Sequence, residues 1–499
     1  MPMPANTAAP EPNTVVIDSG LVKGVRSRDM ITYRGIPYAA PPVGPRRWQP
    51  PEPPPALAGV HDATRFGNRC PQNGASGVFA RPSMSEDCLY LNVFTPAEPG
   101  SGKPVLVWIH GGGLFSGESD DYNPVQLVKQ GSMIVVTINY RLGQLGYFPR
   151  VAKNGHRLPA NYGLLDQQFA LRWVQRNIKA FGGDPDNVTI AGESAGGESV
   201  YALLASPDAA GLFHRAIAQS GGYTPNTPDL HDMSTKSEEF ASRAGCASME
   251  YVCLQSLSVG DLLAAQHEGD TSLVVDGVTL PLALHAAFET GHFNRVPVLS
   301  GMNAHEMRWF SALDRLPGAP IPTLKDAIRS LSTMYGDRVS AILSRYPPDG
   351  QPDAISALAA PATDAEMACP QNTFDRLLSR WVPVYAYEFN DPTAPSYMPD
   401  TGFALGAAHT FELQYLFSGF HGATGSKREL NALQQRLSET MIAYWTQFAI
   451  NGVPGNANGL GPTWPAFSVT EEATIALVSP TPIILNGYRA RHHCDFWNN

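Results

Sequence analysis

The sequence predicts an α/β fold in which helices cover both faces of a mainly parallel β-sheet. Short apolar runs rich in β-branched residues alternate with helical patterns from residue 90 onward. Such alternation is typical of parallel strands joined by crossover helices. Hydrophobic residues form 43% of the 499 residues, which is enough for a large core. The segments between elements are long, so one large domain with insertions is favoured over the three small domains that length alone suggests.

The individual elements follow from local patterns. Over 162–181, apolar residues recur at 165, 169, 173, 174, 178 and 181, which predicts a helix that ends at Gly182-Gly183. A second helix is expected over 194–206, because apolar and small residues dominate SAGGESVYALLAS. Strands are expected at 89–95, 104–110, 133–140, 187–192, 296–301 and 382–389.

The N-terminal end differs in composition from the rest of the chain. Residues 1–12 are small, proline-rich and nearly uncharged, and they lack the basic and apolar regions of a signal peptide. We expect a flexible N-terminal tail there, followed by a single domain over 13–499. The sequence leaves open whether a signal peptide has been removed, and whether the protein is a monomer or a dimer.

Composition excludes several classes of function. There are 35 Lys and Arg against 45 Asp and Glu, a net charge of −10 with no basic run, so nucleic-acid binding is not expected. No stretch of about 18 apolar residues occurs, so no membrane span is expected. Neither CxxC nor HxxxH spacing is present, so neither a metal site nor another cofactor is expected.

Six cysteines allow fifteen pairings if all are bridged. Proximity in the sequence favours Cys70 with Cys88 and Cys246 with Cys253, which leaves Cys369 for Cys494. Six buried thiols in a cytosolic enzyme are the alternative.

The strongest local motif is Gly192-Glu193-Ser194-Ala195-Gly196, which fits G-x-S-x-G between a predicted strand and a predicted helix. A tight turn there would expose the Ser194 hydroxyl above the sheet and place the positive end of the helix beside it. An ordinary helix-capping serine is the competing interpretation.

A second motif, His110-Gly111-Gly112-Gly113, follows the strand predicted at 104–110. A phosphate-binding loop is disfavoured because no GK[ST] follows. We interpret the glycines as an oxyanion hole, in which N–H groups of Gly112 and Gly113 join that of Ala195.

A nucleophilic serine needs a histidine base and an acid that orients it, in the chain order serine, acid, histidine. Glu306 follows the predicted strand 296–301 and is the preferred acid, with Asp276 as a rival. His409 has small neighbours that would let its ring cross a site, and it is preferred over His421, His492 and His493.

These segments resemble type-B carboxylesterases, the family of cholinesterases and bacterial para-nitrobenzyl esterases. The resemblance covers nearly the whole chain and rests on four motifs: YRGIPYAAPPVGPRRW (33–48), SEDCLYLNVFTP (85–96), WIHGGGLFSG (108–117) and FGGDPDNVTIAGESAGG (181–197). It implies an α/β-hydrolase fold, with Ser194, Glu306 and His409 as the triad and Gly112, Gly113 and Ala195 as oxyanion donors. Around Glu306 the family usually has Asp-Glu-Gly, whereas this chain has His305 and Met307 as neighbours.

The resemblance further implies ester hydrolysis through an acyl-enzyme on a small-molecule substrate, in a gorge lined by aromatic side chains. Phe115, Trp309 and Phe310 are the expected lining residues, with Phe411 and Tyr415 as further candidates. All six cysteines fall where the family's disulfide-bearing branch pairs them, which favours a secreted or periplasmic bacterial protein over a cytoplasmic one. Two alternatives remain: a non-catalytic adhesion relative, and cleavage of amides, thioesters or lactones at the same site.

Overall fold

The structure is a computed structural model that describes residues 12–74, 79, 81–98, 100–149, 158–246, 251–315 and 320–498. The expected N-terminal tail, 1–12, lies outside the described residues except for Pro12.

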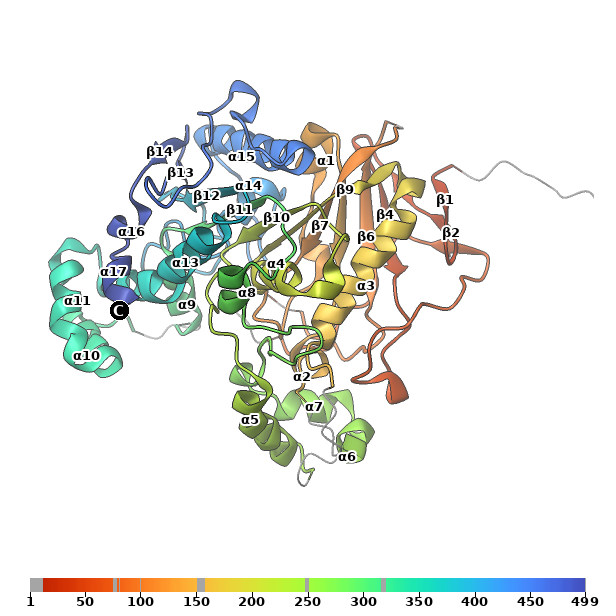
Figure 1. The fold of residues 1–499 in the computed structure, drawn as a ribbon, viewed down its shortest axis with the longest axis horizontal. Coiled ribbons are helices and arrows are strands. Elements are labelled where there is room, and N and C mark those ends of the chain that lie inside the picture. Colours follow the sequence, from red (N-terminus) through yellow and green to blue (C-terminus); the bar gives the residue numbers. More distant parts are fainter. Residues whose placement is uncertain are drawn as a thin grey trace, which may run out of the picture.

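A large mixed sheet forms the centre of the molecule (Figure 1). In spatial order its strands are β14 (Ile483–Leu485), β13 (Thr474–Leu477), β12 (Val384–Phe389), β11 (Val298–Asn303), β10 (Arg215–Gln219), β9 (Gly183–Glu193), β7 (Lys103–Ile109), β8 (Ile134–Ile138), β6 (Tyr90–Pro96), β4 (Met30–Pro37) and β3 (Val25–Arg26). Strands β13 through β8 in this order run parallel, whereas β14 at one edge and β6, β4 and β3 at the other pair antiparallel. The described residues also contain a small sheet of β1 (Thr14–Ile17), β2 (Gly20–Lys23) and β5 (Val60–Asp62).

Helices alternate with these strands. They are α1 (Val125–Gly131), α2 (Gly143–Gly146), α3 (Tyr162–Asn177), α4 (Ala195–Ala205), α5 (Leu230–Arg243), α6 (Tyr251–Ser256), α7 (Val259–Ala265), α8 (Leu284–Thr290), α9 (Glu306–Leu313), α10 (Leu324–Tyr335), α11 (Val339–Arg345), α12 (Ala354–Ala362), α13 (Cys369–Leu378), α14 (Leu413–Leu416), α15 (Ala432–Asn451), α16 (Tyr488–Arg491) and α17 (Cys494–Trp497). A π-helical segment, Thr363–Ala368, joins α12 to α13. The two predicted helices are confirmed as α3 and α4.

Both faces of the sheet are buried, as predicted. Alternate side chains of a strand point to opposite faces, and in β7 Val105, Val107 and Ile109 belong to one apolar cluster while Leu106 and Trp108 belong to another. The first cluster includes residues of α3, α4, α8 and α13, and the second includes residues of α1 and α15. Figure 1 shows these two groups of helices on different sides of the strands. The predicted α/β-hydrolase class, a mainly parallel sheet covered on both faces, is therefore confirmed.

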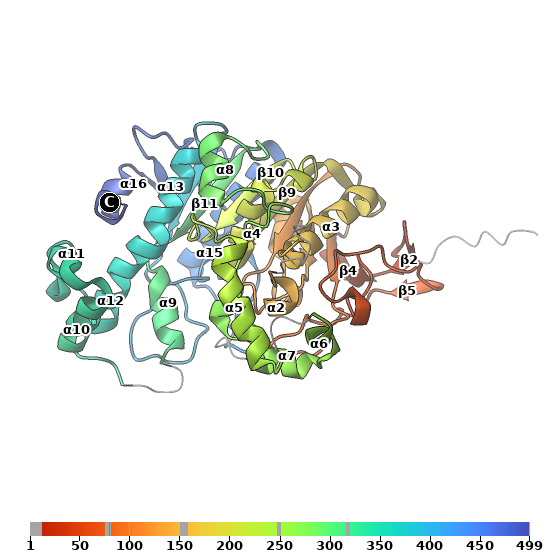
Figure 2. The ribbon, with the colours of Figure 1, turned by 60° about the horizontal axis from the view of Figure 1, so that its bottom comes forward.

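The predicted long insertions are mainly helical. Helices α5 to α8 lie between β10 and β11 in the chain, and α9 to α13 lie between β11 and β12. Figure 2 shows α5, α6 and α7 grouped at the bottom of the view, and α10, α11 and α12 at its left. The first group packs around the buried Trp48 through Phe240, Leu254 and Leu262. Each insertion starts after the carboxyl end of a central parallel strand.

All six cysteines lie in the described part of the chain, and they pair as predicted: Cys70–Cys88, Cys246–Cys253 and Cys369–Cys494. The alternative of six free thiols is therefore wrong. Within the described residues, no helix combines the length and the apolar character needed to cross a membrane.

Candidate active site

Ser194 occupies a strained turn between β9 and α4. Its backbone has φ 55° and ψ −126°, a combination that costs a residue with a Cβ about 1–3 kcal/mol. Backbone hydrogen bonds hold the turn: the Ser194 N–H donates to the carbonyl of Gln219 (2.9 Å), and the N–H of Glu198 donates to the Ser194 carbonyl (2.8 Å). Ser194 is partly exposed, whereas its neighbours Glu193 and Ala195 are buried. The serine hydroxyl is thus presented from a turn whose flanks are fixed.

The glycines of the motif are needed because backbones approach closely at this turn. A Cβ on Gly196 would lie 2.1 Å from the carbonyl oxygen of Ile109, at the end of β7. A Cβ on Gly192 would lie 2.5 Å from the backbone of Gly196. Only glycine permits this contact between the turn and β7.

The glycine loop that follows β7 lies directly against Ser194. A Cβ on Gly111 would lie 3.0 Å from the Cβ of Ser194 and 2.8 Å from the carbonyl oxygen of Glu193. Gly112 and Gly113 have φ values of +101° and +61°, and the Gly112 carbonyl accepts hydrogen bonds from the N–H groups of Phe115 (3.1 Å) and Ser116 (2.9 Å). The three residues expected to form the oxyanion hole therefore lie on two segments that meet at Ser194.

Glu306 and His409, far apart in the sequence, are in contact. Oε2 of Glu306 lies 2.5 Å from Nδ1 of His409. The other oxygen of Glu306 accepts hydrogen bonds from the Ser220 hydroxyl (2.6 Å) and the Asn303 N–H (2.7 Å). Glu306 is fully buried and His409 is 2% exposed. These bonds fix the carboxylate and, through it, the orientation of the imidazole.

His305, one of the two departures from the family pattern, has a place in this arrangement. Its Nδ1 accepts a hydrogen bond from the N–H of Ala407 (3.2 Å), and its own N–H donates to the Ala407 carbonyl (2.9 Å). The segment before Glu306 is therefore bound to the segment before His409.

The other imidazole nitrogen of His409 faces Glu193, the residue before Ser194. Nε2 of His409 lies 3.2 Å from Oε1 of Glu193. Burial would lower the pKa of His409, but Glu193 and Glu306 outweigh burial and raise this pKa to about 9. Burial, opposed by His409, raises the pKa of Glu193 well above its usual range. The side chains of Glu193 and His409 therefore compete for a proton at the turn that carries Ser194.

A third buried carboxyl group, Glu412, lies behind this pair. It accepts hydrogen bonds from the side-chain amides of Gln219 (3.0 Å) and Asn303 (2.6 Å). Burial raises its pKa to about 7. The sequence interpretation missed Glu193, Glu412 and Ser220. Glu193 could have been found from the sequence, because an acidic residue at the end of a predicted buried strand, directly before the serine of the G-x-S-x-G motif, is unusual.

Two of the expected aromatic residues lie beside the imidazole. The ring centroids of Trp309 and Phe310 are 5.7 and 5.0 Å from that of His409. Phe115 lies in the glycine loop and is partly exposed. Phe411, in contrast, is fully buried against Tyr397, and the Tyr415 hydroxyl donates to Asp391 (2.7 Å). Phe411 and Tyr415 therefore pack in the core.

The rival acid and the rival histidines are used elsewhere. Asp276 is buried and accepts hydrogen bonds from the backbone N–H groups of Ala160, Val278, Thr279 and Leu280, so it shapes a turn. His421 contacts the Gly419 carbonyl (2.6 Å), and His492 bridges Asp364 and Glu388. His493 packs on the ring of Tyr346.

Comparison with known proteins decides the family. The model of the carboxylesterase family matches residues 11–497. The chain belongs to the carboxylesterase family. It is 34% identical to para-nitrobenzyl esterase of Bacillus subtilis (strain 168), over 94% of this chain and 95% of that protein. It is 35% identical to human carboxylesterase 3, over 94% of this chain and 88% of that protein.

Solved structures agree with the fold of this carboxylesterase. A thermophilic PNB esterase superposes with a TM-score of 0.80 at 32% identity, covering 97% of this chain and 99% of that chain. A structure of PNB esterase also gives a TM-score of 0.80 at 32% identity, covering 96% and 98% of the two chains. The protein is therefore a carboxylic ester hydrolase, and the adhesion alternative is set aside.

Proposed function

We propose that this carboxylesterase cleaves small-molecule esters through an acyl-enzyme on Ser194, with His409 as general base and acid and Glu306 as the orienting acid. The observation that carries the proposal is the position of the His409 ring, between Glu306 at 2.5 Å and the residue preceding Ser194 at 3.2 Å. A serine on a strained strand-to-helix turn, a buried histidine and a buried carboxylate are the parts that this chemistry requires.

In the proposed reaction, the Ser194 oxygen attacks the ester carbonyl carbon while Nε2 of His409 accepts the hydroxyl proton. The C–O bond to the alcohol then breaks, and the imidazolium returns the proton to the leaving alkoxide. Water, deprotonated by the same nitrogen, attacks the acyl carbon; the bond from this carbon to the Ser194 oxygen then breaks, and the imidazolium returns the proton to that oxygen, which releases the acid and free Ser194. The N–H groups of Gly112, Gly113 and Ala195 stabilise the negative oxygen of both tetrahedral intermediates.

Phe115, Trp309 and Phe310 are proposed to bind the apolar part of the ester. Their support is the closeness of Trp309 and Phe310 to the imidazole and the place of Phe115 on the glycine loop. Apolar pockets gain affinity with each buried methylene, by about 0.8 kcal/mol. We expect KM on p-nitrophenyl esters to fall as the acyl chain lengthens, and Phe310→Ala to weaken that trend.

Kinetics of triad variants on p-nitrophenyl acetate test the proposal. Ser194→Ala and His409→Gln are each expected to lower kcat/KM by about 10⁴-fold or more, because the triad acts as a unit. His421→Gln, which changes a rejected histidine, is the matched control and is expected to stay within about twofold. Retention by His409→Gln of more than a tenth of the wild-type kcat/KM would show that another group is the base.

A matched anilide separates ester cleavage from amide cleavage at the same site. We expect p-nitroacetanilide to be turned over at least about 10³-fold more slowly than p-nitrophenyl acetate, because an amide carbonyl reacts more slowly with a nucleophile than an ester carbonyl does. Equal rates on the two substrates would favour the amidase alternative.

We further propose that residues 13–499 form one catalytic domain and that the protein is exported. Strands from Val25 to Leu485 share one sheet, which supports a single domain. Three disulfides support an oxidising compartment. Recovery of the native enzyme from the source cells with free thiols in the cytoplasmic fraction would contradict export.

A further inference from the structure

The disulfide loop Cys70–Cys88 lies against the end of the glycine loop. Gln72 is fully buried, and its side-chain amide hydrogen-bonds both polar backbone groups of Gly117 and, through Nε2, the Cys70 carbonyl (3.3 Å). Its Nε2 donates to the Gly117 carbonyl (3.0 Å), and its Oε1 accepts from the Gly117 N–H (2.8 Å). One amide therefore satisfies both polar backbone groups of Gly117.

Gly117 in turn closes the glycine loop on itself. Its φ is +110°, and a Cβ there would lie 2.4 Å from Nδ1 of His110 and 2.5 Å from the carbonyl oxygen of Gly111. The end of the loop thus rests on its beginning. A Cβ on Gly111 would in turn lie 3.0 Å from the Cβ of Ser194, so we expect a shift at Gly117 to reach the segment containing Gly112 and Gly113.

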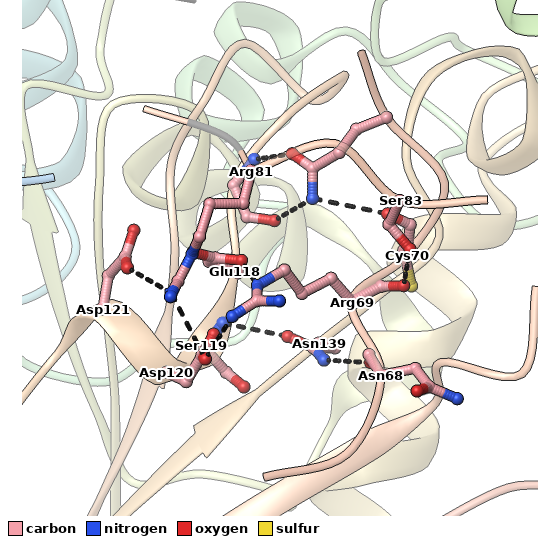
Figure 3. Close-up of polar contacts among 12 residues, drawn as sticks. Asn68, Arg69, Cys70, Arg81, Ser83, Glu118, Ser119, Asp120, Asp121 and Asn139 are labelled. Carbon is pink, nitrogen blue, oxygen red and sulfur yellow. Dashed lines mark hydrogen bonds and ion pairs between the residues drawn. The ribbon is translucent and has the colours of Figure 1, made fainter. Parts of the chain in front are cut away.

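Ion pairs attach the residues after Gly117 to the same disulfide loop. Figure 3 shows the guanidinium groups of Arg69 and Arg81 reaching the carboxylates of Glu118, Asp120 and Asp121. Nε of Arg81 lies 2.6 Å from Glu118, and Arg69 lies 2.9 Å from Asp120. Glu118 is 1% exposed.

The three carboxylates come within 4.8 Å of one another, a spacing that could hold a cation. Arg69 and Arg81 pair with these carboxyl groups and offset two of their three charges, so their close approach does not require a metal. Asn139 further connects the segment after Gly117 with the segment before Cys70. Its side chain accepts a hydrogen bond from the Ser119 N–H (2.9 Å) and donates one to the Asn68 carbonyl (3.0 Å).

We propose that Gln72 is a positioning residue, whose amide fixes Gly117 and thereby holds the N–H groups of Gly112 and Gly113 where the oxyanion forms. The inference rests on the proposed function. It assigns the disulfide loop a role in turnover and not only in stability: the loop sets the geometry of the oxyanion donors. A misplacement of about 1 Å at such donors can cost about 10²-fold in rate.

The test compares Gln72→Leu, which at similar volume removes both bonds to Gly117 and the bond to the Cys70 carbonyl, with Gln72→Glu, which keeps only an acceptor for the Gly117 N–H. Asn73→Ala is the control, because Asn73 lies in the same loop but donates to the Leu263 carbonyl (3.2 Å), away from the glycine loop. Active sites are counted by endpoint titration with diethyl p-nitrophenyl phosphate. The kcat per titrated site, KM and the inhibition constant of a trifluoromethyl ketone are then measured.

We expect Gln72→Leu to lower kcat per site about 10- to 100-fold and the affinity for the ketone by a similar factor, with KM changed less than threefold. The kcat per site of Gln72→Glu should lie between those of Gln72→Leu and wild type. If Gln72→Leu does not fold, Gln72→Glu is compared with Asn73→Ala in its place. A purely structural role would reduce the number of titrated sites and leave kcat per site equal to that of Asn73→Ala, which would overturn the proposal.

A parallel measurement on Ser194→Ala distinguishes failure of the proposed function from failure of the positioning role of Gln72. If Ser194→Ala turns over ester like wild type, the proposed function fails and the positioning role fails with it. If Ser194→Ala is inactive while Gln72→Leu matches Asn73→Ala, only the positioning role fails.

Discussion

In the proposed mechanism His409 accepts the proton of Ser194, which only the neutral ring can do, and the carboxyl groups around His409 oppose the neutral form. Burial favours the neutral ring, yet Glu193 and Glu306 together raise the pKa of His409 to about 9. Glu306 contacts Nδ1, the nitrogen that keeps its proton in the proposed mechanism, which suits the orienting role proposed for it. Glu193 contacts the nitrogen that must lose its proton. The two glutamates therefore affect the same imidazole in different ways.

Replacing Glu193 should shift the pH dependence of the enzyme. The neutral fraction of His409 grows as pH rises through the pKa of this group, so kcat/KM should rise with pH. In Glu193→Gln the carboxyl group whose charge most raises this pKa is gone, so the midpoint of the profile should move to lower pH. The pH profile of kcat/KM on p-nitrophenyl acetate measures it. Glu239→Gln, at an exposed glutamate of α5, should leave the midpoint unchanged; an unmoved midpoint in Glu193→Gln as well would contradict the argument.

At the residue scale, the motifs pointed to side chains that the structure places in one region, Glu306 and His409 in contact and Ser194 on a strained turn, and their catalytic roles remain predictions. Ser194 follows from G-x-S-x-G, and Glu306 and His409 follow from chain order and the resemblance. Glu412 and Ser220 could not be found in this way, because their closeness to Glu306 depends on how β10, β11 and the segment around His409 are placed in space. No local pattern in the sequence reports that register.

At the scale of elements, His492, which lies between the C-terminal helices α16 and α17, binds them to the rest of the domain through two ion pairs. Nδ1 of His492 lies 2.6 Å from Asp364 in the π-helical segment, and Nε2 lies 3.1 Å from Glu388 on β12. Burial opposes protonation of His492, but the hydrogen bonds to Asp364 and Glu388 prevail and raise its pKa to about 9. The charged imidazole thus joins α16 and α17 to two elements of the core.

This raised pKa gives His492 a pH-dependent contribution to stability. The contribution is complete below pH 6.5, the ordinary pKa of histidine, and is lost as pH rises through about 9. His492→Gln should therefore be less stable than wild type at pH 6, and the gap in unfolding free energy should shrink by about 3 kcal/mol at pH 10. Urea unfolding at the two pH values measures the gap. His231→Gln, an exposed histidine, is the control, and a gap that widens with pH would refute the account.

The elements that the sequence predicted are those with long apolar runs, such as β7, β8 and β12. Strand β10, RAIAQ, is five residues long and β13, TIAL, is four, so neither gives a distinct pattern. Strand β4 contains Gly35 and ends at Pro37, both of which argue against a strand locally. Strand β4 nevertheless forms because it pairs with β6, with an irregular register between Tyr33 and Ile36.

At the scale of the whole molecule, the disulfides differ in what they connect. Cys369–Cys494 joins α13 to the start of α17 across a separation of 125 residues, whereas Cys246–Cys253 spans 7 residues. Loop-closure entropy grows with the logarithm of loop length, so the first bridge constrains the unfolded chain more. The alternation of strands and helices predicted the single α/β architecture; the order of the strands depends on such long-range contacts and could not be read from local pattern.

Removing each bridge tests this difference. Replacing both Cys369 and Cys494 by Ala should lower the free energy of unfolding by about 5 kcal/mol, and the same change at Cys246 and Cys253 by about 2.5 kcal/mol. Urea unfolding of the two double variants beside wild type provides the comparison. A larger loss from the short loop would contradict the entropic argument.

The proposed mechanism requires acylation of the Ser194 hydroxyl, and covalent labelling shows whether this hydroxyl is the nucleophile. Wild-type protein and Ser194→Ala are each treated with diethyl p-nitrophenyl phosphate, and the intact mass and the labelled peptide are determined by mass spectrometry. We expect one diethylphosphoryl group per wild-type chain, on the peptide that contains Ser194, and none on Ser194→Ala. A label on any other residue, or equal labelling of Ser194→Ala, would contradict it.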